Sequence, residues 1–431
     1  MHRSRYAALG GLLLFACSPS PALEEPAASA GMGGTAGTAV TTAGGGNGGG
    51  GASGSGGSNG GTTPGGSAGL GGSSGAGGSA PQANFTAQPT TFKGGAKGAY
   101  TIIHDDLCGS PGSLVSGSVS GLLAARGLHA AFGAIVKDCI DAEHWPAVNT
   151  LAGAGHEIIN HSWDHTDHVC AANYPVQIDQ AHTSLGENVA TPSFYIFPFD
   201  SSNDAALDHL KTLGYLGARG GVKGALTPGD WADDFKLNFD VYGPGYSFYC
   251  DLGACGGETL VCRKGYAEVA CVDGGPDGTN QGDDACRASI LQQYVDDAMA
   301  QGGWAIREFH GVDDGWEPVP TAIYSAHLDY VAAKASAGEL WVENPTPIIK
   351  YRRAREYCAA TVSDWTLSFG TPSADCVKYA VPVTYEITLQ TPATTLTATQ
   401  AGTALTVTSK GAGSFLVEID PTQGDVLFSA P

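Results

Sequence analysis

Apolar and polar residues alternate in a regular order along the chain from about residue 99. Short apolar runs are followed by longer segments whose apolar residues have helical spacing, a pattern that indicates strands followed by helices. The predicted strands are residues 99–103, 130–136, 156–159, 193–197, 215–219 and 304–309. The predicted helices are residues 115–126, 141–154, 178–189, 203–213, 288–301, 323–334 and 347–355. This alternation predicts an α/β fold with a parallel sheet and outer helices.

The pattern changes after about residue 360. Short segments rich in threonine and valine, separated by glycine, proline or glutamine, predict a small antiparallel β-unit at residues 359–431. Its predicted strands are residues 379–389, 394–399, 403–407 and 414–419. We expect this unit to pack against the α/β region, with carbohydrate binding as the alternative role.

The first 84 residues are not expected to fold. Residues 1–17 combine a positively charged start with an apolar run that is too short to cross a bilayer as a helix. The run ends in Leu14-Phe15-Ala16-Cys17, which resembles a bacterial lipobox. We therefore expect export and a lipid on Cys17 that anchors the protein to the cell envelope, with an ordinary secretory signal as the alternative. Ser18 does not resemble an inner-membrane retention signal and favours the outer membrane.

Composition changes this picture in three further places. Residues 18–84 are mostly small and polar, which predicts a flexible linker.

Eleven cysteines are present, so ten remain beside a lipidated Cys17, and up to five disulfides are possible in an exported protein. Five of the ten lie in a glycine-rich and aspartate-rich insertion at residues 243–287. A zinc knuckle is the alternative for this group, but it lacks paired Cys-x-x-Cys spacing.

The chain is strongly acidic, with 21 Lys and Arg against 42 Asp and Glu, and its formal charge is −21. A nucleic-acid backbone would be repelled by such a surface, so nucleic acid is not an expected partner. The charge leaves the oligomeric state open.

Two short stretches carry the residues of a metal site. His104-Asp105-Asp106 ends the first predicted strand, and His161-Ser162-Trp163-Asp164-His165 follows the third. The two histidines of the second stretch are four residues apart, which would place both imidazoles on one face of a helical turn. Two imidazoles and one carboxylate bind zinc as in a hydrolase and leave a position open for water. The second carboxylate of the Asp pair then stands beside the metal as a base.

These stretches, in this order, resemble motifs one and two of the NodB-homology polysaccharide deacetylases, carbohydrate esterase family 4. Weaker similarities follow in the family's order at residues 196–199, at Asp230-Trp231 and at the apolar run that ends in His310-Gly311. The resemblance covers roughly residues 97–358, within a predicted domain at residues 85–358. It implies a distorted or incomplete (β/α) barrel whose active residues collect at the carboxyl ends of the strands.

The resemblance also implies a role for each site residue. The metal ligands would be Asp106, His161 and His165, and the metal would be zinc, with cobalt or another divalent ion as alternatives. Asp105 would take a proton from metal-bound water, and His310 would protonate the leaving group, oriented by Asp230. The backbone N–H of Phe199 would stabilise the oxyanion.

One position departs from the family's pattern. The family's third motif has an arginine that holds the catalytic aspartate, and this chain has Ile196 there. Arg219 and Arg307 both lie near predicted strand ends and are candidates to replace it. The predicted function is a metal-dependent hydrolase that removes acetyl groups, as amides or esters, from a carbohydrate polymer. The alternatives are a carbohydrate-binding lipoprotein that keeps the fold and metal but not turnover, and a purely structural adhesin.

Overall fold

The computed structural model describes residues 83–166, 169–242 and 284–431. All of them belong to the second of two units, which spans Ala76–Pro431. The predicted lipobox at Cys17, most of the linker at residues 18–84 and most of the insertion at residues 243–287 lie outside the described residues. None of the helices in the described ranges is both long enough and apolar enough to cross a membrane.

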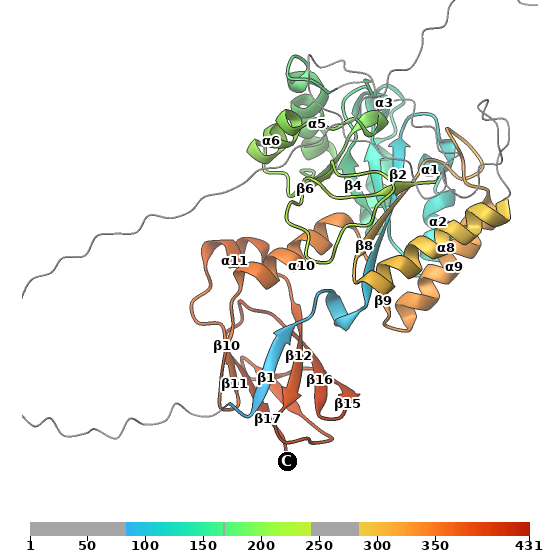
Figure 1. The fold of residues 1–431 in the computed structure, drawn as a ribbon. Helices are drawn as coiled ribbons and strands as arrows, with labels where there is room; N and C mark the ends of the chain where they lie inside the picture. The colour runs from blue at the N-terminus through green and yellow to red at the C-terminus, as the bar shows by residue number, and fades with distance from the viewer. Residues whose placement is uncertain (1–82, 167–168, 243–283) are drawn as a thin grey trace, which may run out of the picture. The chain divides into compact units, whose positions relative to one another are not determined.

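The centre of the fold is a sheet whose strands are all parallel (Figure 1). Its strands are β2 (Gly98–Leu107), β3 (Ala131–Ala134), β4 (Glu157–Asn160), β5 (Phe194–Ile196), β6 (Gly217–Arg219), β7 (Asp240–Val241), β8 (Trp304–Phe309) and β9 (Leu340–Val342). The order β6-β5-β4-β3-β2-β8-β7 leaves β6 and β7 at opposite ends of this path, while β9 pairs with the first residues of β2. The sheet therefore curls into an incomplete barrel, as predicted.

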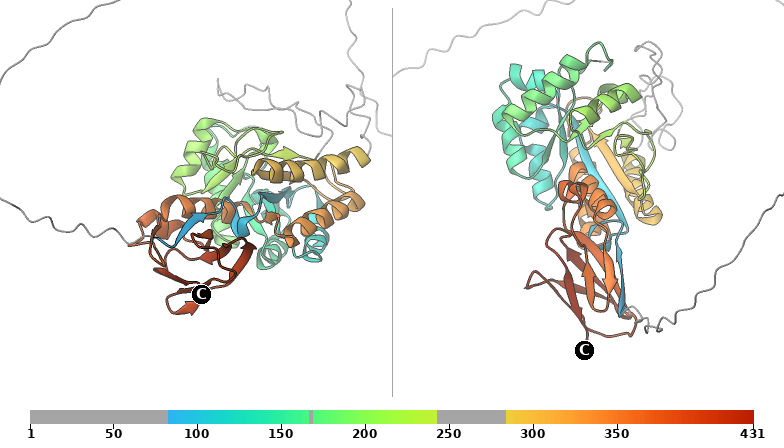
Figure 2. Two further views of the ribbon diagram at one scale, coloured as in Figure 1. Left: turned by 60° about the horizontal axis from the view of Figure 1, so that its bottom comes forward. Right: turned by 90° about the vertical axis from the view of Figure 1, so that its left-hand side faces the viewer.

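Helices lie around these strands in both views of Figure 2. They are α1 (Gly112–Val115), α2 (Ser118–Ala124), α3 (Val136–Asp141), α4 (Trp145–Gly153), α5 (Ala181–Asn188), α6 (Asp204–Thr212), α8 (Asp284–Gln301), α9 (Thr321–Ser336) and α10 (Pro345–Tyr357), with the short helical turns η1 (Lys93–Gly95), η2 (Pro175–Gln180) and η3 (Pro198–Asp200). The helices predicted at residues 115–126 and 141–154 are each divided in two. Gly117, with φ of 82°, ends the first turn because a left-handed residue cannot continue a helix. Glu143 has φ of 55° and separates α3 from α4 in the same way.

Alternate residues of the central strands face two separate cores. Ile103 on β2 and Ile306 on β8 lie in the apolar interior of the barrel. Their neighbours Ile102 and Ala305 lie in the larger cluster between the strands and the helices. This two-residue period decides which side chains at the strand ends can meet inside the barrel.

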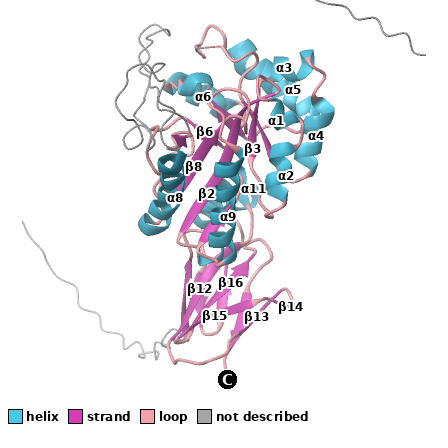
Figure 3. Cartoon of the chain, turned by 90° about the vertical axis from the view of Figure 1, so that its right-hand side faces the viewer, coloured by secondary structure: helices cyan, strands magenta, loops and turns pink. Residues whose placement is uncertain are grey.

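The C-terminal residues form two antiparallel sheets, seen below the barrel strands in Figure 3. One has the order β1-β12-β16-β15 and the other β10-β11-β17-β13-β14. The strands are β1 (Phe85–Pro89), β10 (Thr361–Ser363), β11 (Thr366–Ser368), β12 (Val383–Leu389), β13 (Thr397–Gln400), β14 (Thr403–Ala404), β15 (Val407–Gly411), β16 (Ser414–Ile419) and β17 (Val426–Ser429), with helix α11 (Ala374–Tyr379) between β11 and β12.

The β-unit contacts segments at both ends of the barrel domain: the strand that precedes its first barrel strand and its last helix. The first described strand, β1, precedes the barrel and pairs along its whole length with β12. Tyr351 and Ala354 of α10 lie in the same apolar cluster as both sheets. The β-unit therefore packs against the α/β region, as expected.

Disulfides occur in both parts of the folded chain. Cys108 is bonded to Cys139 and ties the end of β2 to α3, and Cys358 is bonded to Cys376 and ties α10 to α11. Cys170 is also disulfide-bonded. Such bonds agree with the cysteine usage expected of an exported protein.

Candidate metal and catalytic site

The C-terminal end of β2 carries the two aspartates that the sequence singles out. Asp105 follows the interior residue Ile103 by two positions and therefore points into the barrel. Asp106 has φ of 64°, and its carbonyl accepts a hydrogen bond from Gly109 N at 2.8 Å. This left-handed residue turns the chain at the end of the strand, so that two successive carboxylates are available on the same side.

His161 and His165 are brought together by a loop and not by the predicted helical turn. Ser162 and His165 both have positive φ, 72° and 55°, which excludes a helix. The Ser162 hydroxyl accepts a hydrogen bond from the backbone N–H of His165 at 3.0 Å and closes the loop. The two imidazole centroids are 4.8 Å apart. The spacing in sequence therefore predicts the pairing correctly but its backbone conformation wrongly.

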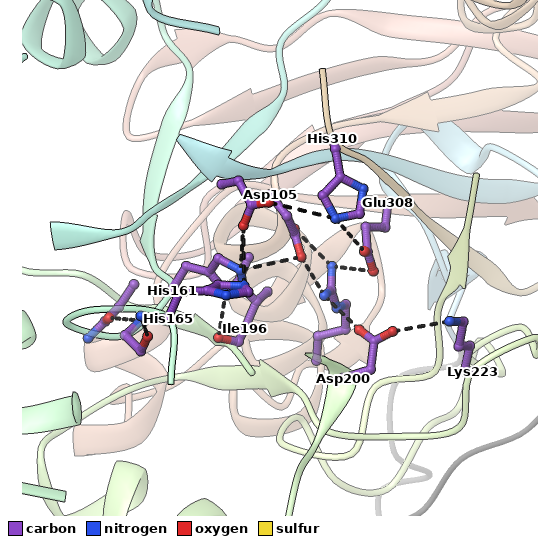
Figure 4. A network of polar contacts seen from close by, with 12 residues as sticks. Asp105, His161, His165, Ile196, Asp200, Lys223, Glu308 and His310 are labelled. Atoms are coloured by element: carbon purple, nitrogen blue, oxygen red, sulfur yellow. Dashed lines mark hydrogen bonds and ion pairs between the residues drawn. The ribbon is translucent and has the colours of Figure 1, made fainter. Parts of the chain in front are cut away.

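Asp106, His161 and His165 form the metal-ligand cluster found in the described part of the chain. Asp106 Oδ1 lies 3.4 Å from His161 Nε2 and 3.3 Å from His165 Nε2 (Figure 4). Ligand atoms about 2.0–2.1 Å from a tetrahedral zinc ion lie roughly 3.3 Å from one another. Asp106 Oδ1 is buried and has no hydrogen-bond partner among the described residues. The cluster thus fits a divalent cation by its donors, by their separation and by its unsatisfied oxygen.

The protonation of His165 and Asp106 agrees with this fit, whereas the pKa of His161 is raised despite its burial, because the carboxylates of Asp105 and Asp106 lie beside it. Burial and the nearby His161 lower the pKa of His165 to about 4, so that its imidazole is neutral at neutral pH. Burial by itself would raise the pKa of Asp106, but the imidazoles, above all His161, hold it below its ordinary value. His161 Nδ1 lies 3.2 Å from the Ile196 carbonyl, to which it donates, and this leaves Nε2 free to act as a ligand.

Arg219 lies at the centre of a buried group of carboxylates beside the ligand cluster. Its Nη1 and Nη2 donate to Asp105 Oδ1 and Oδ2 at 3.0 and 2.7 Å. Nη2 also donates to Asp200 Oδ1 at 2.9 Å, and Nη1 lies 2.8 Å from Glu308 Oε2. The guanidinium packs over the ring of Phe239 at 4.7 Å. Burial alone would lower the pKa of Arg219, but these carboxylates raise it, so the cation is permanent.

Arg219, one of the two candidates to replace the arginine missing at Ile196, thus reaches Asp105 from the strand beside Ile196. Ile196 and Arg219 are Cα partners on the adjacent strands β5 and β6, so the guanidinium enters the barrel from the next strand at the same level. Ile196 fills the space over Gly133, where an added Cβ would lie 2.3 Å from Ile196 Cδ1. A bidentate hydrogen bond from arginine fixes both oxygens of a carboxylate and so orients Asp105.

Arg307, the other candidate, faces away from the site. Arg307 is two residues from Ala305 and therefore faces the same side of β8, toward the helices. There its Nη1 donates to Asp240 Oδ2 at 2.6 Å and to the Val241 carbonyl at 3.0 Å. Its guanidinium lies 4.4 Å from the ring centroid of Tyr294. Arg307 belongs to a structural ion pair, and it does not reach Asp105.

His310 follows β8 and lies beside the ligand cluster, with Nε2 4.0 Å from Asp106 Oδ2 and 3.9 Å from Glu308 Oε1 (Figure 4). Its backbone carbonyl accepts a hydrogen bond from His104 Nδ1 at 2.6 Å. The His104 ring, whose Nε2 accepts from Tyr324 at 2.7 Å, thus fixes the end of β8 against β2. Burial lowers the pKa of His104 to about 4, which keeps it a neutral structural residue.

Asp230 is not placed to orient His310. It is exposed, and its neighbour Trp231 packs against Trp304, the first residue of β8, with ring centroids 5.2 Å apart. His310 follows the other end of that strand, which is roughly 20 Å long at about 3.3 Å per residue. Trp231 instead donates to Asp234, which also pairs with Arg353. The Asp-Trp pattern here belongs to a structural cluster at the opposite end of the barrel.

Phe199 lies in η3, and its ring is 4.7 Å from that of His165. Its φ of 54° places it in the left-handed region. The oxyanion role of its backbone N–H stays a prediction.

Sequence reasoning missed two acidic residues of this site, Asp200 and Glu308. Asp200 contacts both Arg219 and Lys223, the latter at 3.4 Å, and these two cations hold its pKa below the ordinary value despite burial. Burial raises the pKa of Glu308 well above its ordinary value, and the nearby Asp105 and Asp200 add to the effect. The sequence does contain one signal, because Glu308 precedes His310 by two residues and so shares its face of the strand.

Comparisons with known proteins give one family match and several remote structural matches. Residues 97–218 match the model of the polysaccharide deacetylase family. A protein described as a polysaccharide deacetylase of Mycobacterium smegmatis aligns with 14% identity and a TM-score of 0.41 over 62% of this chain and 94% of that chain. A family 4 carbohydrate esterase from Streptomyces lividans, solved with acetate, aligns with 16% identity and a TM-score of 0.34 over 57% of this chain and 92% of that one.

A family 4 acetyl xylan esterase from Clostridium thermocellum, solved with a cobalt ion, aligns with 16% identity and a TM-score of 0.35 over 58% of this chain and 89% of that one. No curated protein matches the chain significantly. The assignment therefore depends on the sequence match, which covers four of the site residues, Asp105, Asp106, His161 and His165. Over residues 97–218 this chain is similar to the polysaccharide deacetylase family.

Proposed function

We propose that this protein removes acetyl groups from a carbohydrate polymer, with Asp105 as the base and His310 as the acid. The observation that carries the proposal is the pairing of Asp105 with Arg219 directly beside the cluster of Asp106, His161 and His165. Asp105 Oδ2 lies 3.8 Å from His161 Nε2, so the carboxylate borders the ligand cluster without belonging to it. A binding protein would have no need of an oriented carboxylate at this point.

Asp106, His161 and His165 would hold the metal ion. A divalent cation in such a site supplies Lewis acidity and lowers the pKa of a coordinated water. Zinc suits two imidazoles and a carboxylate, and cobalt is accepted by similar donors.

The side chains around the cluster supply the proton transfers. Asp105, fixed at both oxygens by Arg219, retains a lone pair on each oxygen that can accept a proton from an attacking water. His310 lies on the Oδ2 side of Asp106, while His161 and His165 contact Oδ1. The base and the acid therefore approach the site from different sides, and a departing amine or alkoxide would take its proton from His310. Both N-acetyl and O-acetyl substrates suit this arrangement.

The alternative of a binding protein without turnover rested on the missing arginine at position 196. Because Arg219 pairs with Asp105 from the next strand, this reason no longer applies.

Removal of the metal tests the proposed function directly. Treatment with a chelator should abolish acetate release from acetylated chito-oligomers or acetylated xylan, and added zinc or cobalt should restore it. Acetate can be measured enzymatically, and protein-bound metal by mass spectrometry on the same samples. Acetate release that persists in fully metal-free protein would contradict a metal-dependent mechanism. A metal-loaded, folded protein that releases no acetate from either substrate would contradict the proposed activity.

We also propose that the protein works at the cell envelope, attached by a lipid on Cys17 through the linker at residues 18–84. The support is the sequence pattern around Cys17 and the disulfides of the folded part, which suit an oxidising compartment. Cys17→Ala should move the protein from the membrane fraction to the soluble fraction. If wild type and variant fractionate alike, the anchor is absent.

A further inference from the structure

One loop on the catalytic side of the barrel has no part in the chemistry described so far. It comprises residues 311–319, between His310 and α9, and we call it the β8–α9 loop. Trp316 within it is 54% exposed, and it is the one aromatic residue among the large apolar side chains that lie on the described surface. Single exposed apolar side chains are common on protein surfaces, so what distinguishes Trp316 is its position on the loop that directly follows His310.

The β8–α9 loop is tightly built. Backbone hydrogen bonds of 3.1 Å run from Val319 N to the Gly311 carbonyl and from Asp313 N to the Val319 carbonyl, and they close its base. The Asp313 carboxylate accepts from Thr321 N at 2.8 Å and caps α9. Trp316 is therefore presented from a closed loop whose ends are both fixed.

A second set of contacts ties this loop to the segment that follows the catalytic aspartates. The Asp314 carboxylate accepts hydrogen bonds from the backbone N–H of Ser113, at 2.7 Å, and from the Ser113 hydroxyl. Gly315 packs so closely on Pro111 that an added Cβ would lie 2.7 Å from its ring. The segments that follow β2 and β8 are thus joined into one rim, and Trp316 belongs to the rim that adjoins Asp106 and His310.

Two properties of this rim identify the class of ligand. An indole face packs well against the C–H face of a pyranose ring, because both are flat and apolar while the sugar hydroxyls remain in water. The loop also carries Asp313, Asp314 and Glu317, and the whole chain has a formal charge of −21, so a polyanionic chain would be repelled.

We propose that Trp316 is a substrate-binding residue that stacks on a pyranose ring of an uncharged polysaccharide chain, next to the sugar that loses its acetyl group. This inference rests on the proposed function and narrows it to neutral pyranose polymers. We expect Trp316 to contribute little to the binding of a small acetyl ester or a single acetylated sugar, which occupies only the position of the reacting sugar. The residue therefore discriminates a chain from a monomer.

The test compares Trp316→Ala and Trp316→Phe with the intact protein on acetylated chito-oligomers and on a small aryl acetate. Trp316→Ala should raise KM for the oligomers by roughly three- to tenfold, and the aromatic variant should recover much of this loss. Hydrolysis of the aryl acetate should not change. Leu427→Ala removes a similarly exposed apolar side chain from β17, where it is 57% exposed, and serves as the matched control.

A binding measurement separates the failure of this inference from that of the proposed function. Calorimetric titration of the oligomer into Asp105→Asn, with and without Trp316→Ala, needs no turnover. A loss of affinity of the same three- to tenfold supports the stacking role even if no acetate is released. The inference would be overturned if Asp105→Asn bound the oligomer equally well with and without Trp316→Ala, or if neither variant bound it. Tighter binding of an acetylated polyuronate than of the neutral oligomer would also overturn it.

Discussion

Asp105→Asn is expected to lower the rate of acetate release by roughly a thousandfold or more, because the general base is lost while its shape is kept. The ligand atoms of Asp106, His161 and His165 are untouched, so the bound metal should remain stoichiometric. The measurement is kcat on acetylated oligomers, together with the metal content of the same preparation. This is the largest effect that we expect on activity alone.

Asp200→Asn is the matched control for this change. It also removes a carboxylate charge in contact with Arg219, but Asp200 borders Lys223 and not the ligand cluster. Its effect on kcat should be far smaller than that of Asp105→Asn. If Asp105→Asn retains activity within tenfold of wild type, another group must act as the base.

Arg219→Met is expected to affect both stability and activity. The substitution leaves Asp105, Asp200 and Glu308 buried without their shared cation, and breaking a buried pair in this way typically costs about 3–5 kcal/mol. The rate should fall as well, because Asp105 loses the two hydrogen bonds that orient it. Chemical denaturation measures the first effect, and kcat of the remaining folded protein measures the second.

Arg307→Met separates the two effects. Arg307 is equally buried and is paired with Asp240, but it faces the helices. It should lower the free energy of unfolding while leaving kcat of the folded fraction near that of wild type. An exchange variant, Ile196→Arg with Arg219→Ile, should recover part of the rate lost in Arg219→Ile, since the two positions are register partners. Equal losses of kcat in the Arg219 and Arg307 variants would show that Arg219 has only a structural role.

The sequence was sufficient for the order of six of the eight barrel strands, because each of these is a short apolar run, but it missed the short strands β7 and β9. It also predicted that Asp106, His161 and His165 lie together, because Asp106 lies near the end of a strand and both histidines lie in one short loop. The helical turn predicted for His161 and His165 was wrong, since the Ser162 hydroxyl stabilises a left-handed conformation of the loop instead. Such a side-chain bond has no periodic signal.

The choice between Arg219 and Arg307 depends on which side of its strand each residue faces. The sequence contains this information, because successive residues of a strand face opposite sides. Arg307 and Glu308 are adjacent on β8 and must face opposite sides of the sheet. Since His310 faces the site, Glu308 faces it too, and Arg307 cannot. The position of Asp230 could not be obtained in this way, because it lies in an irregular segment whose path is set by the packing of Trp231 on Trp304.

The pairing of β1 with β12 has a mechanical consequence. If the chain is held at Cys17, any tension along the linker arrives at Phe85, the first residue of β1. The load then falls on the hydrogen bonds between β1 and β12, which run from Phe85–Leu389 to Pro89–Tyr385, before it can reach β2 and the aspartates at its far end. A pull that arrives through the linker would therefore load the pairing of β1 with β12 in the C-terminal β-unit before it loads the strand that carries the aspartates.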